Sequence, residues 1–411
     1  MRPIAVVSIL LAAGLVAALP PTAQGSPAGT PLVRMRDGHG SDLLFRLDPR
    51  TLQQVGRPIR TFRGGSDLKM SPDGSRLAFA DPWHGGARRG AGIHFVDLAG
   101  WRSKGVARLG RHAWFTMGWV SEDRVIAITG DDPGRERFIW VDANTRKVLA
   151  RRAFSGWTAN SVPVPGGLAV ALGPSEGTGP LRILLLDPNG GVRTIVVDGV
   201  RAGADYRDRG GEVLTPAVTV DPGTGRLYVV AARGLLVAEV ELTTGVVAYH
   251  SLGASASKGD NAVWWRYAAS TGDGHIAVTG DHWPRPRGRV FDGPVPFGLR
   301  MIDTSDWSIA TLHEQTDAMH VADGAVLATG TRYVEPGRSE SYGLQAFDTS
   351  GRRVFTRFRG LRVALLGSRG RLAYAWVRRT RRAHVIDLAT GRTLDTIRTG
   401  RGSPHLLSPY P

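Results

Sequence analysis

An acidic residue recurs along this chain between an apolar run and a turn, and its spacing constrains the fold more than any other feature. The spacings between successive acidic positions are 49, 45, 45, 54, 62, 45 and 39 residues. The positions are Asp48, Asp97, Asp142, Asp187, Glu241, Asp303, Asp348 and Asp387. A repeat of roughly 40 to 50 residues is typical of the four-stranded blades of a propeller. The sequence therefore predicts an all-β ring of repeated sheets.

The first half of the repeated unit is clearest at Ser71-Pro72-Asp73-Gly74. Pro presets φ for a turn, Asp bonds nearby backbone N–H groups, and Gly tolerates a positive φ, so this stretch predicts a hairpin turn. The run from Leu77 to Ala80 that follows is apolar on both faces. Such a strand is expected between two covering sheets.

These repeats resemble those of a known group of proteins. Ser71 to Ala80 and Val385 to Leu394 are similar to the repeats of exported bacterial β-propellers of the YVTN and TolB-like type, within the broader WD40-like set. The resemblance covers roughly Pro31 to the C-terminus and implies a propeller. It does not identify a function, because function on this scaffold resides in sites added to it.

The two ends of the chain are predicted to share one blade. Leu32–Met35, Asp42–Leu47 and Gln53–Ile59 suit a second, third and fourth strand, and the missing first strand is expected within Gly402–Pro409. Closing the ring with strands from both termini would leave no open sheet edge. We therefore expect a single propeller domain over residues 31–411, with eight four-stranded blades. Seven blades is the alternative if the N-terminal segment is an extra edge.

Residues 1–28 have the features of a signal peptide. Arg2 supplies a positive start, Ile4 to Leu19 is apolar, and small residues precede Ser26. At about 1.5 Å per residue the apolar stretch would span ~24 Å as a helix, less than the ~30 Å hydrocarbon core of a bilayer. We expect cleavage before Ser26 and a secreted or cell-envelope protein. An uncleaved membrane anchor is the alternative.

Charge and cysteine content limit the chemistry and the partners. The net charge is +16 and there is no cysteine, which excludes disulfides, thiol chemistry and a lipidated N-terminal cysteine. A positive surface favours anionic counterparts such as wall polymers, lipid headgroups or acidic proteins. Nucleic acid is disfavoured because no recognition motif occurs. We expect a monomer whose partner is a protein or a cell-envelope polymer.

Catalytic motifs are mostly absent from the sequence. The nearest approach to a Gly-x-Ser-x-Gly elbow is Gly367-Ser368-Arg369-Gly370, where Leu366 stands in place of the first glycine. There is no phosphate-binding loop, no His-Glu-x-x-His and no cysteine metal site. No cofactor is therefore predicted. Calcium bound by the adjacent carboxylates of Asp131 and Asp132 is the one metal that we consider.

Propeller geometry predicts a site where the loops after second strands meet the segments leading into first strands. Asp81, Trp83 and His84 follow one second strand, and Asp281, His282 and Trp283 repeat their chemistry after another. Carboxylate, imidazole and indole together suit a cation or a sugar-like ligand. The candidate ligand-binding residues are Asp81, Trp83, His84, Asp131, Asp132, Trp264, Asp281, His282, Trp283 and His320. Trp265, Arg266, Asp317 and His405 lead into first strands nearby in the predicted ring. Turn formation by the Asp residues and packing between blades by the Trp residues are the competing interpretations.

Three functions are compatible with these features of the sequence. The preferred one is an exported, non-catalytic propeller that binds a protein, a glycan or an anionic wall polymer on this loop face. The alternative is an enzyme with its site in the central tunnel, of the lactone hydrolase or lyase type that the resemblance includes, with a metal as an option. A scaffold anchored in the envelope by its retained N-terminal helix is the third.

Overall fold

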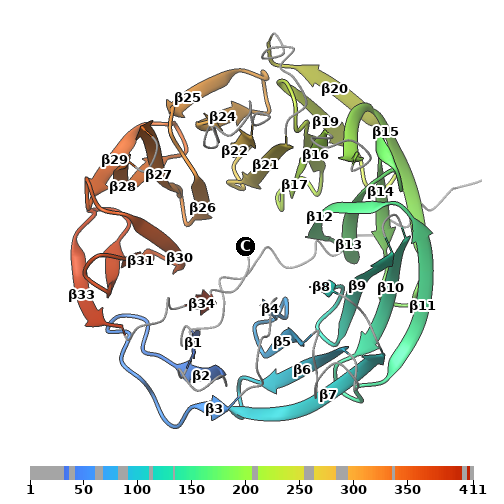
Figure 1. Ribbon diagram of the computed structural model, residues 1–411, viewed down its shortest axis with the longest axis horizontal. Helices are drawn as coiled ribbons and strands as arrows, with labels where there is room; N and C mark the ends of the chain where they lie inside the picture. Colours follow the sequence, from blue (N-terminus) through green and yellow to red (C-terminus); the bar gives the residue numbers. More distant parts are fainter. Residues whose placement is uncertain are drawn as a thin grey trace, which may run out of the picture.

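The computed structural model describes residues 32–36, 42–60, 68–81, 91–110, 114–132, 135–205, 212–253, 263–283, 295–335, 338–399 and 405–407. These ranges contain strands β1 to β34 and no helix. Figure 1 shows the sheets arranged around a ring, with strands such as β4, β8 and β30 nearest the centre and β7, β11 and β33 at the rim. The predicted all-β single propeller is confirmed.

The sheet that closes the ring combines both ends of the described chain. Its strands, in spatial order, are β3 (Ile59–Arg60), β2 (Asp42–Arg46), β1 (Leu32–Arg36) and β34 (His405–Leu407). β34 pairs with β1 in antiparallel fashion, and Leu32 lies opposite Leu407. The prediction that strands from the two ends meet in one sheet is confirmed, and backbone hydrogen bonds join them.

Five further sheets of the described chain each contain four strands that are consecutive in sequence. Two of them follow the closing sheet: β4 (Leu68–Met70), β5 (Arg76–Asp81), β6 (Ala91–Asp97) and β7 (Arg102–Gly110); then β8 (Trp114–Trp119), β9 (Arg124–Asp132), β10 (Arg135–Asp142) and β11 (Val148–Ser155). A third is β17 (Ala217–Val220), β18 (Leu227–Val230), β19 (Leu236–Val240) and β20 (Val247–Ser251). The last two are β26 (Ala318–Ala322), β27 (Ala325–Glu335), β28 (Arg338–Asp348) and β29 (Arg353–Arg357); then β30 (Val363–Arg369), β31 (Leu372–Val377), β32 (Arg382–Asp387) and β33 (Thr393–Arg398).

The remaining strands form one sheet of ten strands. It begins with β12 (Trp157–Val164), β13 (Gly167–Gly173), β14 (Gly177–Leu186) and β15 (Val192–Ala204). It ends with β21 (Val263–Ser270), β22 (His275–Trp283), β24 (Leu299–Asp303) and β25 (Ile309–His313), and β23 (Val295–Pro296) pairs with β22. β16 (Val213–Thr215) joins the two series because it pairs antiparallel with β15 and parallel with β21.

The predicted set of eight, or alternatively seven, separate four-stranded sheets is therefore wrong. Among the described residues, six sheets have four strands and one has ten. The physical reason is the segment before β17, which forms β16 instead of a plain connection. The backbone of β16 forms hydrogen bonds with β15 and with β21, which belong to different series of strands. The apolar pattern of Val213 to Thr215 does not predict this double pairing.

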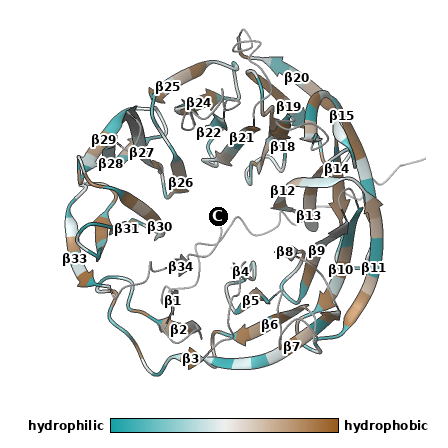
Figure 2. Ribbon diagram, in the orientation of Figure 1, coloured by the Kyte–Doolittle hydropathy of each residue, from teal (hydrophilic) through white to brown (hydrophobic). Residues whose placement is uncertain are grey.

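The core lies between neighbouring sheets, as the apolar strands predict. β13 is buried along its whole length and β5 along all but its first residue, because other sheets cover both of their faces. The outer strand β11 instead alternates between partly buried and exposed side chains. Figure 2 shows the corresponding mixture of hydrophilic and hydrophobic residues along β7 and β11 at the rim. Packing between sheets therefore stabilises the ring.

The recurring acidic residues stabilise the turns that close the third strands. Oδ1 of Asp142 accepts hydrogen bonds from the backbone N–H groups of Asn144 and Thr145 and from the Thr145 hydroxyl. Oδ1 of Asp387 likewise accepts hydrogen bonds from the backbone N–H and the hydroxyl of Thr390. Gly391, the next residue in this turn, has a φ of 67°. These bonds lower the pKa of Asp387 from its usual value. The repeat that identifies the fold is thus a repeat of turn chemistry.

The turn at Ser71 to Gly74 also forms as predicted, between β4 and β5. The N–H of Gly74 donates to the carbonyl oxygen of Ser71 at 2.8 Å, and Gly74 has a φ of 69°. The Ser71 hydroxyl donates to Oδ1 of Asp73 at 2.6 Å.

No helix within the described ranges is long and apolar enough to cross a membrane. The predicted signal peptide at residues 1–28 lies outside those ranges.

Candidate functional site

The candidate site lies where β21, β22 and β24 meet at one end of the ten-stranded sheet. Trp264, Trp265 and Arg266 of β21 lie opposite His282, Asp281 and Gly280 of β22, respectively. The segments after second strands and before first strands share this end of the ring, which we call the loop face. The order of strands in the sequence predicted this convergence for Trp264, Asp281, His282 and Trp283.

Gly280 permits the close approach of β21 and β22 at this point. Its φ is 152°, and a Cβ atom added there would lie 2.1 Å from the carbonyl oxygen of Trp265. No side chain tolerates a contact of that length with a backbone atom. The carbonyl oxygen of Gly280 accepts a hydrogen bond from the N–H of Phe297 at 2.7 Å, which holds the segment leading into β24 against the same site.

Trp264 and His282 form an aromatic stack within the sheet. Their ring centroids are 4.3 Å apart and their planes differ by 16°. Trp264 is 3% exposed and packs with Leu214 of β16 and Ala232. Burial and the nearby Arg266 lower the pKa of His282, so its imidazole is neutral at pH 7. Trp264 thus contributes to packing between blades, which was the competing interpretation for this residue.

Two arginines lie against one phenylalanine ring at the centre of the site. The guanidinium carbon of Arg266 is 3.8 Å from the ring centroid of Phe297, and that of Arg300 is 4.4 Å from it. Arg266 is only 2% exposed, and within the described part of the chain its side chain donates one hydrogen bond, from NH1 to the carbonyl oxygen of Trp265. Burial and then Arg300 lower the pKa of Arg266 to about 10, so it stays charged at pH 7.

No ion pair within the described residues neutralises either arginine. No carboxylate of the described residues lies within ion-pair distance of Arg266 or Arg300, and Nε of Arg266 is buried without a hydrogen-bond acceptor. A buried guanidinium without a counterion costs several kcal/mol of desolvation that is only partly offset by the aromatic ring. Within the described residues, the cluster therefore carries positive charge that no ion pair neutralises, although the charge of Asp281 acts on Arg266.

Asp281 is a carboxylate of the described residues whose charge acts on Arg266, and its environment weakens that charge. Burial and then the nearby Asp317 raise the pKa of Asp281 to about 6, and Arg266 opposes both effects. Burial of its carboxyl group also raises the pKa of Asp317, although the residue as a whole keeps exposed surface. Hydrogen bonds from Thr331 act in the opposite direction and lower the pKa of Asp317. Oδ1 of Asp281 is buried without a donor. A ligand donor would satisfy it.

The aromatic partner of Trp283 is Trp265. Their ring centroids are 6.3 Å apart at an angle of 80°, which is an edge-to-face arrangement. Both indoles are partly exposed, in contrast to Trp264. The structure thus places Trp264, His282 and Arg266 on one face of the β21–β22 pair, with Phe297 and Arg300 against Arg266, and Trp265, Asp281 and Trp283 on the other face.

A recess adjoins the cluster through Leu214. This pocket of about 360 Å3 is lined by Leu214, Ala232, Arg201, Arg233 and Glu212 among others. Arg233 forms an ion pair with Glu212 at 3.2 Å. Because Leu214 and Ala232 also pack on Trp264, the recess opens directly beside the aromatic stack.

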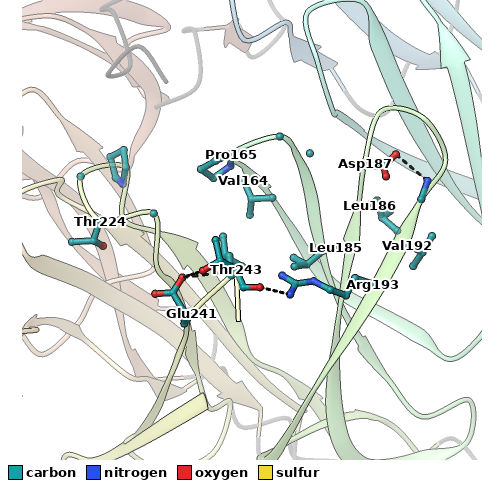
Figure 3. A pocket seen from close by; sticks show the side chains of 17 residues that line it. Val164, Pro165, Leu185, Leu186, Asp187, Val192, Arg193, Thr224, Glu241 and Thr243 are labelled. Carbon is teal, nitrogen blue, oxygen red and sulfur yellow. Dashed lines mark hydrogen bonds between the residues drawn. The ribbon is translucent and has the colours of Figure 1, made fainter. Parts of the chain in front are cut away.

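A larger groove lies at the opposite end of the ring. It has a volume of about 610 Å3 between the hairpin turns of β12–β15 and β17–β20. Figure 3 shows Arg193 reaching across it, where its NH1 donates to the carbonyl oxygen of Thr243 at 2.7 Å. Glu241 and Asp187 bond to residues of their own turns. These contacts make the groove a junction between neighbouring hairpins, and its polar groups satisfy one another.

Of the other predicted site residues, Asp81 and His320 do not join the cluster. Asp81 pairs with His94 inside its own sheet, and His320 contacts Ser368 in the next sheet. Trp83 and His84 lie outside the described residues. Asp131 and Asp132 end β9, but their side chains are outside the described part of the structure, so calcium binding there stays a prediction. No group of three or more metal-ligating side chains occurs among the described residues.

Phe297 and Arg300 were not predicted from the sequence, and Arg266 was not among the candidate ligand-binding residues. Phe297 stands at the end of a long Pro- and Gly-rich insertion. Glu136 was missed as well; it is 3% exposed, and burial raises its pKa to about 7. Arg266 could have been found as a charged residue in an aromatic run, whereas Arg300 has no distinguishing signal in this arginine-rich chain.

Comparisons with known proteins support the fold alone. No protein-family model and no curated protein matches this sequence. The chain is similar to the dihydro-heme d1 dehydrogenase NirN (15% identity, TM-score 0.59, 96% of this chain and 78% of that one) and to apo AztD from Citrobacter koseri (11%, 0.51, 92% and 98%). The propeller domain of the Trilobed protease from Pyrococcus furiosus matches at a TM-score of 0.43 and 12% identity, over 79% and 94%. The YVTN and TolB-like resemblance stays a prediction.

Proposed function

We propose that this chain is an exported binding propeller that holds an anionic cell-envelope polymer on its loop face, at the cluster of Arg266, Phe297 and Arg300. The observation that carries the proposal is the pair of guanidinium groups on one ring with no carboxylate partner in the described structure. Like charges raise each other's free energy, so an anion bound at the partly exposed Arg300 also gains from the charge of the buried Arg266.

Several features favour a polymer with repeated negative groups. The net charge of +16 extends positive potential well beyond the cluster. The partly exposed indoles of Trp265 and Trp283 offer apolar surface on the other face of the same strand pair, and Oδ1 of Asp281 can accept a hydrogen bond from a hydroxyl group. A chain carrying phosphate or carboxylate together with hydroxyl groups matches this set of groups.

Calorimetric titration tests the proposal with three probes: poly(glycerol phosphate), polyglutamate and neutral dextran. Binding of one or both anionic probes is expected, with affinity falling as salt rises from about 50 to about 300 mM, because salt screens exposed charges. Equal binding of dextran would contradict the proposal. The absence of binding by all three probes would also contradict the proposal.

A matched pair of variants locates the site. Arg300→Gln is expected to weaken binding about tenfold, since a hydrogen bond to a charged group contributes about 1.5 kcal/mol. Arg392→Gln removes the same charge from an exposed turn between β32 and β33, at the opposite end of the ring, and should change affinity less than about twofold. Equal losses in both variants would show that only net charge matters.

Export is tested separately by the mature N-terminus. Mass spectrometry of protein recovered from outside the cell is expected to give a first residue of Ser26. A retained Met1 in a membrane fraction would instead favour the anchored scaffold.

A further inference from the structure

Ser368 and His320 come from different sheets and meet at the inner side of the ring. Oγ of Ser368 lies 2.7 Å from Nε2 of His320. Ser368 belongs to β30 and His320 to β26, which Figure 1 places nearest the ring centre in their sheets. Both side chains are partly exposed. The pair is therefore accessible to a small reagent.

A backbone irregularity directs Ser368. The register of β30 against β31 shifts between Leu365 and Gly367, and Gly367 has a φ of 135°. Such bulges re-aim the side chain that follows them. Without the shift, the alternation of the strand would place the residue after Gly367 on the other face. The bulge thus sets Ser368 toward the neighbouring sheet.

His320 has the protonation state that a base requires. Burial lowers the pKa of His320, so the ring is neutral at pH 7 and one of its nitrogens can accept a proton. Ser368 Oγ is the hydrogen-bond partner of His320 among the described residues. A nucleophile within hydrogen-bond reach of a neutral imidazole is the minimal arrangement for acyl transfer.

We propose that Ser368 and His320 form a nucleophile and base pair that accepts an acyl group from an uncharged carboxylic ester. This activity is separate from polymer binding and does not depend on it.

The step balances without a cofactor. Oγ of Ser368 forms a bond to the carbonyl carbon as its proton passes to Nε2 of His320. The bond from that carbon to the alkoxy oxygen breaks, and the leaving alcohol takes the proton from His320. Water then attacks the acyl-serine, with His320 accepting its proton and returning it to Oγ, which releases the acid.

Labelling with a fluorophosphonate tests the pair on the full-length mature chain. The expected result is one adduct per chain, located on Ser368 by peptide mass spectrometry and absent from Ser368→Ala. Ser350 is an internal control, because it is exposed and its hydroxyl donates to the weakly basic carboxylate of Asp348 instead of bonding to an imidazole. No adduct, or equal labelling of Ser350, would overturn the proposal.

His320→Gln separates catalysis from structure, since glutamine can still hydrogen-bond Ser368. Labelling of this variant is expected to be at least about a hundredfold slower, within the range of general-base effects. In the unchanged protein the rate should rise with pH and level off with a midpoint below about 6.5, the ordinary pKa of histidine. An unchanged rate in His320→Gln would assign the pair a purely structural role, whatever its effect on stability.

Discussion

Oδ2 of Asp81 lies 3.2 Å from Nε2 of His94, and the two residues are 2% and 1% exposed. The ring of His94 also stacks on Phe79 at 4.8 Å, with only 6° between the planes. Asp81 and Phe79 belong to β5, and His94 lies on the adjacent β6. Asp81, which the sequence places in a candidate site, is thus part of the interior of its own sheet.

The first prediction is that Asp81→Ala destabilises the fold by about 2 kcal/mol. Removing the carboxylate leaves a buried imidazole without this partner, and such losses cost about 1–3 kcal/mol. Urea denaturation followed by tryptophan fluorescence measures the change. Polymer binding by the folded variant should equal that of the unchanged protein, because Asp81 contributes no atom to the Arg266 cluster. If Asp81→Ala lost polymer binding while its free energy of unfolding stayed unchanged, Asp81 would belong to the binding site.

The second prediction concerns Gly280. Gly280→Ala should destabilise the protein by more than about 2 kcal/mol, because the new Cβ would meet the Trp265 carbonyl oxygen at 2.1 Å as well as straining the backbone. Gly324→Ala is the matched control, since its φ of 66° is similarly unfavourable but no atom lies within 4 Å of the added Cβ. It should cost only about 1 kcal/mol. Similar thermal denaturation midpoints for the two variants would show that β21 and β22 separate easily.

The third prediction is that acid strengthens polymer binding. The pKa of Asp281 is raised to about 6, so lowering the pH from 7.5 to 5.5 neutralises its carboxylate beside Arg266. Removing that negative charge favours a bound anion, and affinity should rise over this window. In Asp281→Asn the rise should disappear, and the affinity at pH 7.5 should match that of the unchanged protein at low pH. Affinity that falls on acidification would contradict the placement of the anion near Asp281.

The fourth prediction follows from Glu136, whose pKa burial raises from 4.5 to about 7. Between these values the native state holds a proton that the unfolded chain has released, so stability falls as pH rises through this window. Glu136→Gln should remove that fall, and at pH 8 the free energy of unfolding of the variant should exceed that of the unchanged protein by about 2 kcal/mol. Glu241→Gln is the control: hydrogen bonds from Thr243 lower the pKa of this partly exposed group, so any small effect has the opposite sign. Denaturation midpoints at pH 4 and pH 8 measure both.

Part of the candidate site could be predicted from the sequence, because it depends on chain order within the repeat. Asp281, His282 and Trp283 end a second strand and Trp264 lies near the start of a first one, so a ring of antiparallel sheets must bring them to one end. The arginine cluster could not be predicted in this way. Arg300 reaches Phe297 only through the fold of the segment after the long insertion, and 48 arginines offer no means of selecting it.

The sequence by itself determined the all-β ring, the positions of its turns and the closing sheet shared by both ends. These features depend on local chemistry: an Asp that binds the next N–H groups, a Gly at positive φ, and strands whose apolar pattern requires cover on both faces. Only the tertiary structure decided that β16 joins two series of strands, that Asp81 faces His94, and that Ser368 faces His320. Those outcomes depend on which residues of different strands come within a few ångströms of one another. The alternation of side chains along one strand does not specify which strand packs beside it.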